Sequence, residues 1–142
     1  VGDAQDQANT LKAIGDVQTF RKDSDDALDS YRQALDLFRS VGDRLGEANT
    51  LKAQGQLFLN EGAVDQGMEL LEAARTLYVA VGARVGIANC GIILGRHAGS
   101  NGNYVAAIDY MQPAADFCFE IGHPLGTELQ AEIDVWRRQL RA

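Results

Sequence analysis

Asparagine recurs at one interval along this chain of 142 residues, at Asn9, Asn49 and Asn89. A side-chain amide carries both donors and an acceptor, so it can pair with the backbone of an extended peptide whatever the peptide's sequence. Three amides at equivalent positions predict a ladder that holds such a peptide. The alternative is that each asparagine belongs to the seam and caps or bridges adjacent hairpins, because copied repeats inherit residues that have no role in binding.

Residue types that serve metal binding or catalysis do not fall into a usable pattern. His97 and His123 have no Cys, Asp or Glu at ligand spacing that a second pair matches. Cys90 and Cys118 form no CxxC pair, and we expect them to be buried, reduced thiols. The acidic run over residues 23–29 suits the start of a helix and lacks the later Gly and Glu of a calcium loop. We therefore predict no metal site, no cofactor and no enzymatic activity.

The chain repeats itself every 40 residues, and this repeat must position the asparagines. Residues 2–15 align without a gap with residues 42–55, a third copy begins at Gly82, and a weak fourth copy begins at Gly122. A fixed period of this size marks stacked supersecondary units. Such arrays usually bind partners along an extended surface.

Each unit contains two stretches in which apolar residues recur three or four residues apart, the period of an α-helix. We predict helices near residues 3–21, 24–40, 44–60, 64–80, 84–100 and 104–120, with a last helix near 124–141. Gly42, Gly82 and Gly122 suit the left-handed position that ends a helix. Asp3 and Asp43, each following a glycine, suit helix N-caps.

The turns inside the units are less uniform. Gly62 and Gly102 mark this turn in units two and three, whereas unit one has Lys22 there, followed by Asp23-Ser24, which can cap the next helix. Pro113 lies inside the sixth helix and is expected to kink it or loosen one turn.

The last helix has the sequence of a cap, with one apolar face and one polar face. Pro124 fits its first turn, where a missing N–H costs nothing. The apolar stripe consists of Leu125, Leu129, Ile133, Trp136 and Leu140.

Glycines inside the helices predict close helix packing, since glycine costs about 1 kcal/mol relative to alanine there. Gly15, Gly55 and Gly95 are expected to lie opposite small residues of the second helix, at Ala27, Gly67 and Ala107. Unit three has two more glycines, Gly91 and Gly99. We interpret these two and Pro113 as sequence drift rather than specialisation for a ligand.

The pattern of large and small residues in each unit resembles the tetratricopeptide repeat in a long form. Such long repeats occur in kinesin light chains, spindle-orienting adaptors and bacterial signalling arrays. The matching residues are Leu11, Ile14, Gly15, Ala27, Tyr31 and Ala34 in unit one, Leu51, Gly55, Phe58, Gly67, Leu71 and Ala74 in unit two, and Leu94, Gly95, Ala107, Met111 and Ala114 in unit three. The chain departs from the family in its period, which is 40 rather than 34 residues, and in its degraded third unit.

The resemblance implies an all-α, right-handed solenoid that forms a single domain over residues 1–142. Its parts would be three helical hairpins and a capping helix, at residues 2–41, 42–81, 82–121 and 122–142. It also implies a non-catalytic module that binds a peptide or protein segment in a concave groove lined by the first helix of each hairpin. Carried over by position, the groove residues are Asn9, Lys12, Asp16, Asn49, Lys52, Gln56, Asn89 and Arg96. The cations among them favour an acidic peptide.

Net charge and hydropathy restrict the classes of partner that the chain is expected to bind. The chain carries a net charge of −7, whereas nucleic-acid binding needs clustered Lys and Arg. No apolar run approaches the roughly 18 residues of a membrane helix, and no basic leader precedes an apolar core. We therefore expect a cytoplasmic protein that binds neither nucleic acid nor membrane. The acid excess over residues 1–80 is either a solvated outer face or a patch for a basic partner.

Val1 aligns with Val41, Val81 and Ile121, so the chain begins at a repeat seam. We expect a fragment of a longer protein whose first helix lacks an N-terminal cap. Two alternatives to peptide binding follow. One is self-association into a homo-oligomer, and the other is a regulatory sensor segment of a larger signalling protein.

Overall fold

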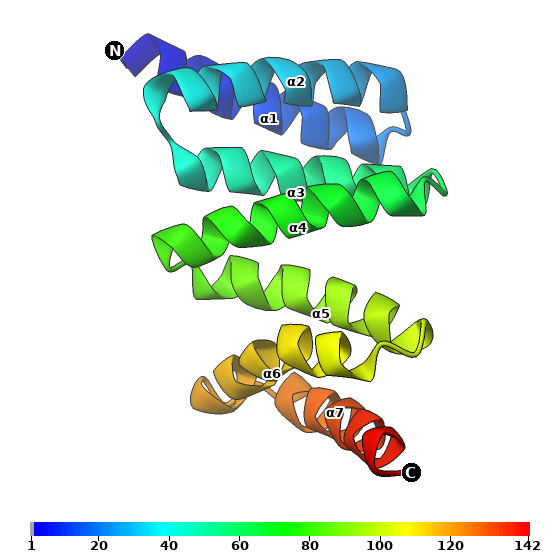
Figure 1. Cartoon of the computed structure of the whole chain (residues 1–142). Coiled ribbons are helices and arrows are strands. Elements are labelled where there is room, and N and C mark those ends of the chain that lie inside the picture. Colours follow the sequence, from blue (N-terminus) through cyan, green and yellow to red (C-terminus); the bar gives the residue numbers. More distant parts are fainter. Residues whose placement is uncertain (1) are drawn as a thin grey trace. The chain divides into compact units, whose positions relative to one another are not determined.

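A computed structural model describes residues 2–142, and the helices and turns of this part include no strand (Figure 1). The helices are α1 (Gly2–Phe20), α2 (Ser24–Val41), α3 (Arg44–Asn60), α4 (Val64–Val81), α5 (Arg84–Ser100), α6 (Tyr104–Glu120) and α7 (Leu125–Arg141). The predicted all-α class is confirmed, and each predicted helix agrees with the structure to within one residue at either end. Amphipathic periodicity is therefore enough to place the helices.

The chain divides into two compact parts, which differ from the 40-residue repeats. We call residues 1–82 unit 1 and residues 83–142 unit 2. In unit 1, α1 packs against α2, α3 packs against α4, and the two hairpins join through α2 and α3. In unit 2, α6 lies between α5 and α7 and contacts both. That residues 1–142 form a single domain stays a prediction.

Left-handed glycines end the second helices, as predicted. Gly42 has φ 72°, and Gly82 and Gly122 take nearly the same angle. After Gly42 the backbone of Asp43 is non-helical, and its carboxylate accepts a hydrogen bond from the Gly46 N–H at 2.8 Å. The predicted N-cap at Asp43 is confirmed, because this bond satisfies one of the open donors of α3. The predicted cap at Asp3 is wrong, since Asp3 lies inside the first turn of α1.

The turn inside the first hairpin uses a lysine where the others use glycine. Lys22 has φ 65°, whereas Gly62 and Gly102 take φ 83° and 78° without a side chain to strain. Asp23 occupies the N-cap position of α2, but its side chain makes no capping hydrogen bond. The predicted Asp23 cap is therefore wrong. In unit 2 the capping bond exists, from the Ala106 N–H to Asn103.

Small residues and a few large ones fill the core of each unit. In unit 1, Ala8 and Ala34 pack with Phe38, and Tyr31 packs with Leu57. Burial of such apolar surface is the main favourable term in folding.

The core of unit 2 confirms most of the predicted stripe of α7. Leu129, Ile133 and Trp136 of α7 are buried against Met111 of α6. Leu140 is 51% exposed, so the prediction that it joins the stripe is wrong. α7 therefore covers α6 along most of its length.

Close packing explains the glycines inside the helices. A Cβ on Gly55 would lie 3.0 Å from the Gly67 carbonyl oxygen, and one on Gly95 would lie 3.1 Å from that of Ala107. Both confirm the predicted pairs. Gly15 differs, because the Tyr31 ring rather than Ala27 would meet its Cβ, at 2.5 Å.

The interpretation of Gly91 and Gly99 as drift is wrong. A Cβ on Gly91 would lie closer than 3.0 Å to the backbone oxygen of Tyr110 in α6. A Cβ on Gly99 would meet the indole of Trp136 in α7 at 2.6 Å. Each glycine makes room for a neighbour, so unit 2 is packed differently rather than degraded. α6 runs unbroken through Pro113.

Candidate functional site

Six of the predicted groove residues belong to unit 1, and the helices that carry them, α1 and α3, contact each other. We call this set of residues the α1/α3 face; it consists of Asn9, Lys12, Asp16, Asn49, Lys52 and Gln56. The six side chains are exposed or half-buried, while neighbours such as Ala8, Ala48 and Leu51 are buried. The helical period separates the two sets, because residues three, four and seven apart share a side of a helix.

Lys12 and Asp16 form an internal network rather than an open site. The Lys12 ammonium lies 2.8 Å from the Asp16 carboxylate. The buried Tyr31 hydroxyl donates to the other Asp16 oxygen at 2.8 Å and lies 3.1 Å from the Thr19 hydroxyl. Burial is the main cause that raises the pKa of Tyr31 to about 12, and the hydrogen bond and negative charge of Asp16 add to it. Asp16 therefore holds two side chains of its own hairpin.

Lys52 differs from Lys12 in having no counter-charge. Within residues 2–142, neither Lys52 nor Gln56 takes part in a side-chain hydrogen bond or an ion pair. Lys52 is half-buried, and a lysine at such a position typically packs its alkyl stem against the protein and keeps its ammonium in water. It is the cation of the α1/α3 face that is ready to accept a carboxylate.

The three asparagines are not equivalent in the structure. The buried Tyr78 hydroxyl of α4 donates to Asn49 Oδ1 at 2.6 Å. The same position of the second helix holds Phe38 in the first hairpin and Cys118 in the third. Asn49 thus joins the two helices of its own hairpin, whereas the second interpretation placed it between adjacent hairpins. Asn9 and Asn89 remain exposed, and Asn9 accepts only a long hydrogen bond of 3.4 Å from Gln5.

Arg96 of unit 2 is already occupied by carboxylates of α7. Its Nη2 lies 2.7 Å from Glu132 Oε1, its Nε lies 3.1 Å from Glu132 Oε2, and Glu128 lies 3.3 Å away. The hydrogen bonds that Arg96 donates to Glu132 are the main cause that raises the pKa of Arg96. The predicted groove position at Arg96 is therefore filled by a helix of the same unit.

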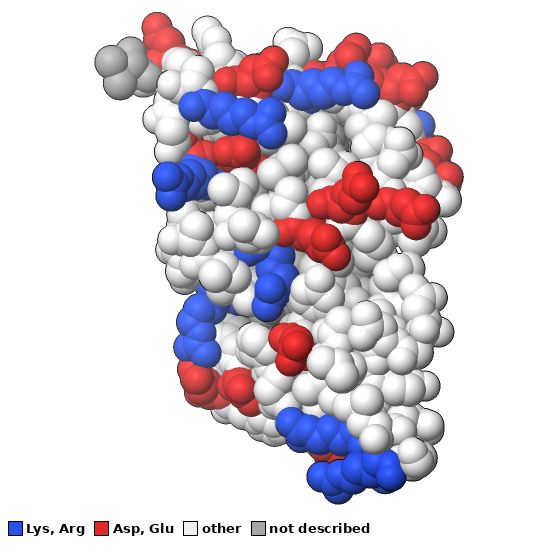
Figure 2. All heavy atoms as spheres, in the orientation of Figure 1, with Lys and Arg blue, Asp and Glu red and all other residues white. Residues whose placement is uncertain are grey.

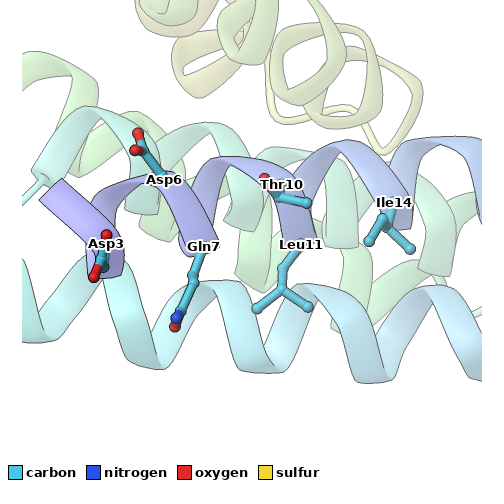
Figure 3. Close-up of a pocket in the computed structure, with 6 residues that line it drawn as sticks. All are labelled: Asp3, Asp6, Gln7, Thr10, Leu11 and Ile14. Atoms are coloured by element: carbon cyan, nitrogen blue, oxygen red, sulfur yellow. The ribbon is translucent and has the colours of Figure 1, made fainter.

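The outward side of α1 is an uncovered surface of unit 1 that sequence reasoning did not place on particular residues. Two adjoining depressions of about 430 Å³ each run along it and share Thr10 and Ile14. Figure 3 shows the N-terminal depression beside α2, with Gln7 and Leu11 pointing toward that helix and Asp6 pointing away. Ile14 is 43% exposed and Val17 is 50% exposed.

The repeat itself shows that this side of α1 is unusual. Forty residues later, Thr50, Gln54 and Leu57 of α3 correspond to Thr10, Ile14 and Val17. Those three residues of α3 are at most 6% exposed, and Leu57 packs against Ala27 and Tyr31 of α2. The same side of the first helix is therefore covered in one hairpin and bare in the other.

The charge distribution agrees with both interpretations of the acid excess, a solvated outer face and a patch for a basic partner. Figure 2 shows acidic side chains gathered over α4 and both signs mixed over α2. Asp65 and Glu69, one helical turn apart, are exposed on α4. An exposed acidic surface of this kind suits either solvation or a basic partner.

The cysteines and histidines of the described part are buried or bonded to neighbours in the chain. Cys90 and Cys118 are buried thiols, as predicted. His97 pairs with Asn101 at 3.1 Å, and His123 Nδ1 accepts the Leu125 N–H at 3.2 Å at the start of α7. Nowhere in residues 2–142 do three or more His, Cys, Asp or Glu side chains gather as metal ligands would.

No protein-family model matches the chain, and no curated protein matches it. The resemblance to tetratricopeptide repeats therefore stays a prediction that depends on the residues quoted above. None of the helices in the described part combines the length and apolar character needed to cross a membrane.

Proposed function

We propose that this chain is a non-catalytic, cytoplasmic interaction module of the tetratricopeptide type that binds an acidic protein segment on its α1/α3 face. The proposal includes the right-handed solenoid that the family resemblance implies. The 40-residue repeat and the pairing of α1 with α2 and of α3 with α4 support it.

The observation that carries the proposal is the unpaired ammonium of Lys52. Elsewhere on the α1/α3 face the charges are neutralised locally, as in the Lys12–Asp16 pair. Lys52 lies beside the unengaged amide of Gln56, one turn further along α3. An ammonium and an amide one turn apart can bind a carboxylate and an adjoining peptide group together.

Unit 2 supplies an internal example of the same recognition. Arg96 lies on the first helix of its hairpin and receives Glu128 and Glu132 from α7. Two glutamates one helical turn apart thus satisfy one cation on a first helix. A partner segment with acidic residues at that spacing would satisfy Lys52 in the same manner.

Binding of a fluorescein-labelled, glutamate-rich peptide, followed by fluorescence anisotropy, tests the proposal. A lysine-rich peptide of equal length is the control for the probe. Lys52→Glu should weaken binding of the glutamate-rich peptide about fivefold, the effect of about 1 kcal/mol from one exposed charge contact.

The matched control is Arg138→Glu, which makes the same change in net charge. Arg138 is exposed on α7 and takes part in no ion pair within the described residues. Its substitution should change the affinity less than about twofold. Equal losses in the two variants, or equal binding of the two peptides, would contradict the proposal.

Self-association is a second candidate function, and the bare outward side of α1 favours it. That side is distinct from the α1/α3 face, so the two functions can be tested separately.

A further inference from the structure

Six exposed side chains at helical spacing line the two depressions along α1. We call this set the α1 stripe; it consists of Asp3, Gln7, Thr10, Ile14, Val17 and Arg21. The intervals alternate between four and three residues, the spacing with which one helix packs along another. Arg21 follows the last residue of α1, and its N–H still bonds the Val17 carbonyl oxygen at 3.0 Å. The stripe is therefore continuous from end to end.

The repeat shows that this side of a first helix is built to receive a helix. Thr50, Gln54 and Leu57 of α3, which correspond to Thr10, Ile14 and Val17, are buried, and Leu57 packs against α2. On α1 the same positions are exposed, and Phe20 beside the stripe is 88% exposed. Exposed apolar side chains in a row beside a large aromatic residue are typical of a docking surface.

The two ends of the α1 stripe carry opposite charges. Asp3 and Asp6 lie in the N-terminal depression, and Arg21 lies in the C-terminal one. Within residues 2–142 none of the three takes part in an ion pair. The middle of the stripe, around Thr10 and Ile14, is uncharged. A stripe that is acidic at one end and basic at the other complements itself when it is reversed.

We propose that the α1 stripe pairs with the α1 stripe of a second copy of this chain, antiparallel, around a twofold axis near residue 12. In this register Asp3 of each copy faces Arg21 of the other. Gln7 faces Val17, and Thr10 faces Ile14. Every contact occurs twice, as a twofold interface requires, and the antiparallel helix dipoles attract.

The size of the stripe sets the strength of the dimer. A helix of 19 residues is about 28 Å long, and one such helix pair forms an interface at the small end of the specific range. We expect a dissociation constant on the order of 10 to 100 μM, and weaker association at high salt because both end contacts are ion pairs.

Charge exchange between two variants tests both the partner and the register. Asp3→Lys and Arg21→Glu should each weaken self-association at least about tenfold, because each places like charges together at both ends. An equimolar mixture of the two variants should dimerise again, since in the mixed dimer both end contacts are between opposite charges. The readout is sedimentation equilibrium over a wide concentration range, against a monomer mass of 15.4 kDa.

A second pair of variants checks the apolar centre. Ile14→Glu should abolish the dimer, whereas Val135→Glu, at a site of equal exposure on α7 (44%), should leave it unchanged. Circular dichroism confirms that each variant keeps its helices. A parent chain that stays monomeric at every concentration would overturn the proposal, and that result would leave α1 for a helix of another protein. Self-association that none of the α1 substitutions weakens, or single variants that fail to recover on mixing, would overturn it as well.

Discussion

Substitution of Gly91 by alanine is the sharpest test of how unit 2 is packed. In a helix interior this change alone favours folding by about 1 kcal/mol, because alanine has the higher helix propensity. The structure opposes it, since the added Cβ would lie closer than 3.0 Å to the Tyr110 carbonyl oxygen. That oxygen belongs to the backbone of α6 and cannot rotate away, so α5 and α6 would have to move apart.

Forcing one extra methyl group into a packed interface costs about 1–3 kcal/mol, occasionally more. A clash with backbone is at the upper end of this range, so we expect Gly91→Ala to lower the free energy of unfolding by roughly 2 kcal/mol net. Gly95→Ala is the matched control on the same helix. Its Cβ would lie 3.1 Å from the Ala107 oxygen, so the strain and the helix propensity should nearly cancel.

Urea unfolding followed by circular dichroism measures both variants. A loss of 2 kcal/mol corresponds to a fall in Tm of about 4–8 °C for a chain of this size, and more where unit 2 unfolds on its own. A Gly91→Ala variant as stable as the parent chain would contradict the predicted clash with α6. A larger loss of stability in Gly95→Ala would contradict it as well.

Three further predictions concern single side chains. Burial raises the pKa of Tyr31 to about 12, above the ordinary value of 10.0; its contribution to stability is fully present below pH 10 and is lost between about pH 10 and 12. Tyr31→Phe should remove this part of the pH dependence of urea unfolding, and an unchanged profile would contradict the assignment. Gly99→Ala should displace the indole of Trp136, the single tryptophan, and shift its fluorescence to longer wavelength; an unshifted spectrum would show that the indole lies elsewhere. Asn49→Ala should lower stability by about 1 kcal/mol through loss of the hydrogen bond from the α4 tyrosine, whereas Asn9→Ala should change it by less than about 0.5 kcal/mol; equal effects would restore the equivalence of the asparagines.

Local pattern in the sequence was enough to predict the helices and most of their ends. Hydrophobic periodicity and the left-handed glycines are properties of neighbouring residues, so no long-range information is needed. Asp3 and Asp43 show the limit of local pattern, because both follow a glycine and only Asp43 caps a helix. Gly42 ends α2 in a left-handed turn, whereas Gly2 is already the first residue of α1.

Side-chain partners far apart in the sequence could not be predicted in this way. The contacts from Tyr78 to Asn49 and from Arg96 to Glu132 join residues 29 and 36 positions apart. Their formation depends on how helices pack and not on local spacing. Comparison of positions 38, 78 and 118 would have given one signal, since a hydroxyl group occurs only in the second hairpin.

The sequence was enough to predict which positions make up the candidate site, but not which of their side chains are already paired within the chain. The sequence identifies Lys12 and Lys52 as equivalent, whereas the structure neutralises Lys12 with Asp16 and leaves Lys52 unpaired. The bare side of α1 was also not assigned to residues, because exposure depends on which neighbouring helices are present.

Amide and side-chain chemical-shift mapping by NMR tests the central claim most directly. The chain would be labelled with ¹⁵N and titrated with the glutamate-rich peptide at constant salt and pH. Binding on the α1/α3 face predicts the largest shift changes at Asn9, Lys52 and Gln56, with small changes on α2 and α4. Shift changes centred on α2 and α4, or none at saturating peptide, would contradict the account.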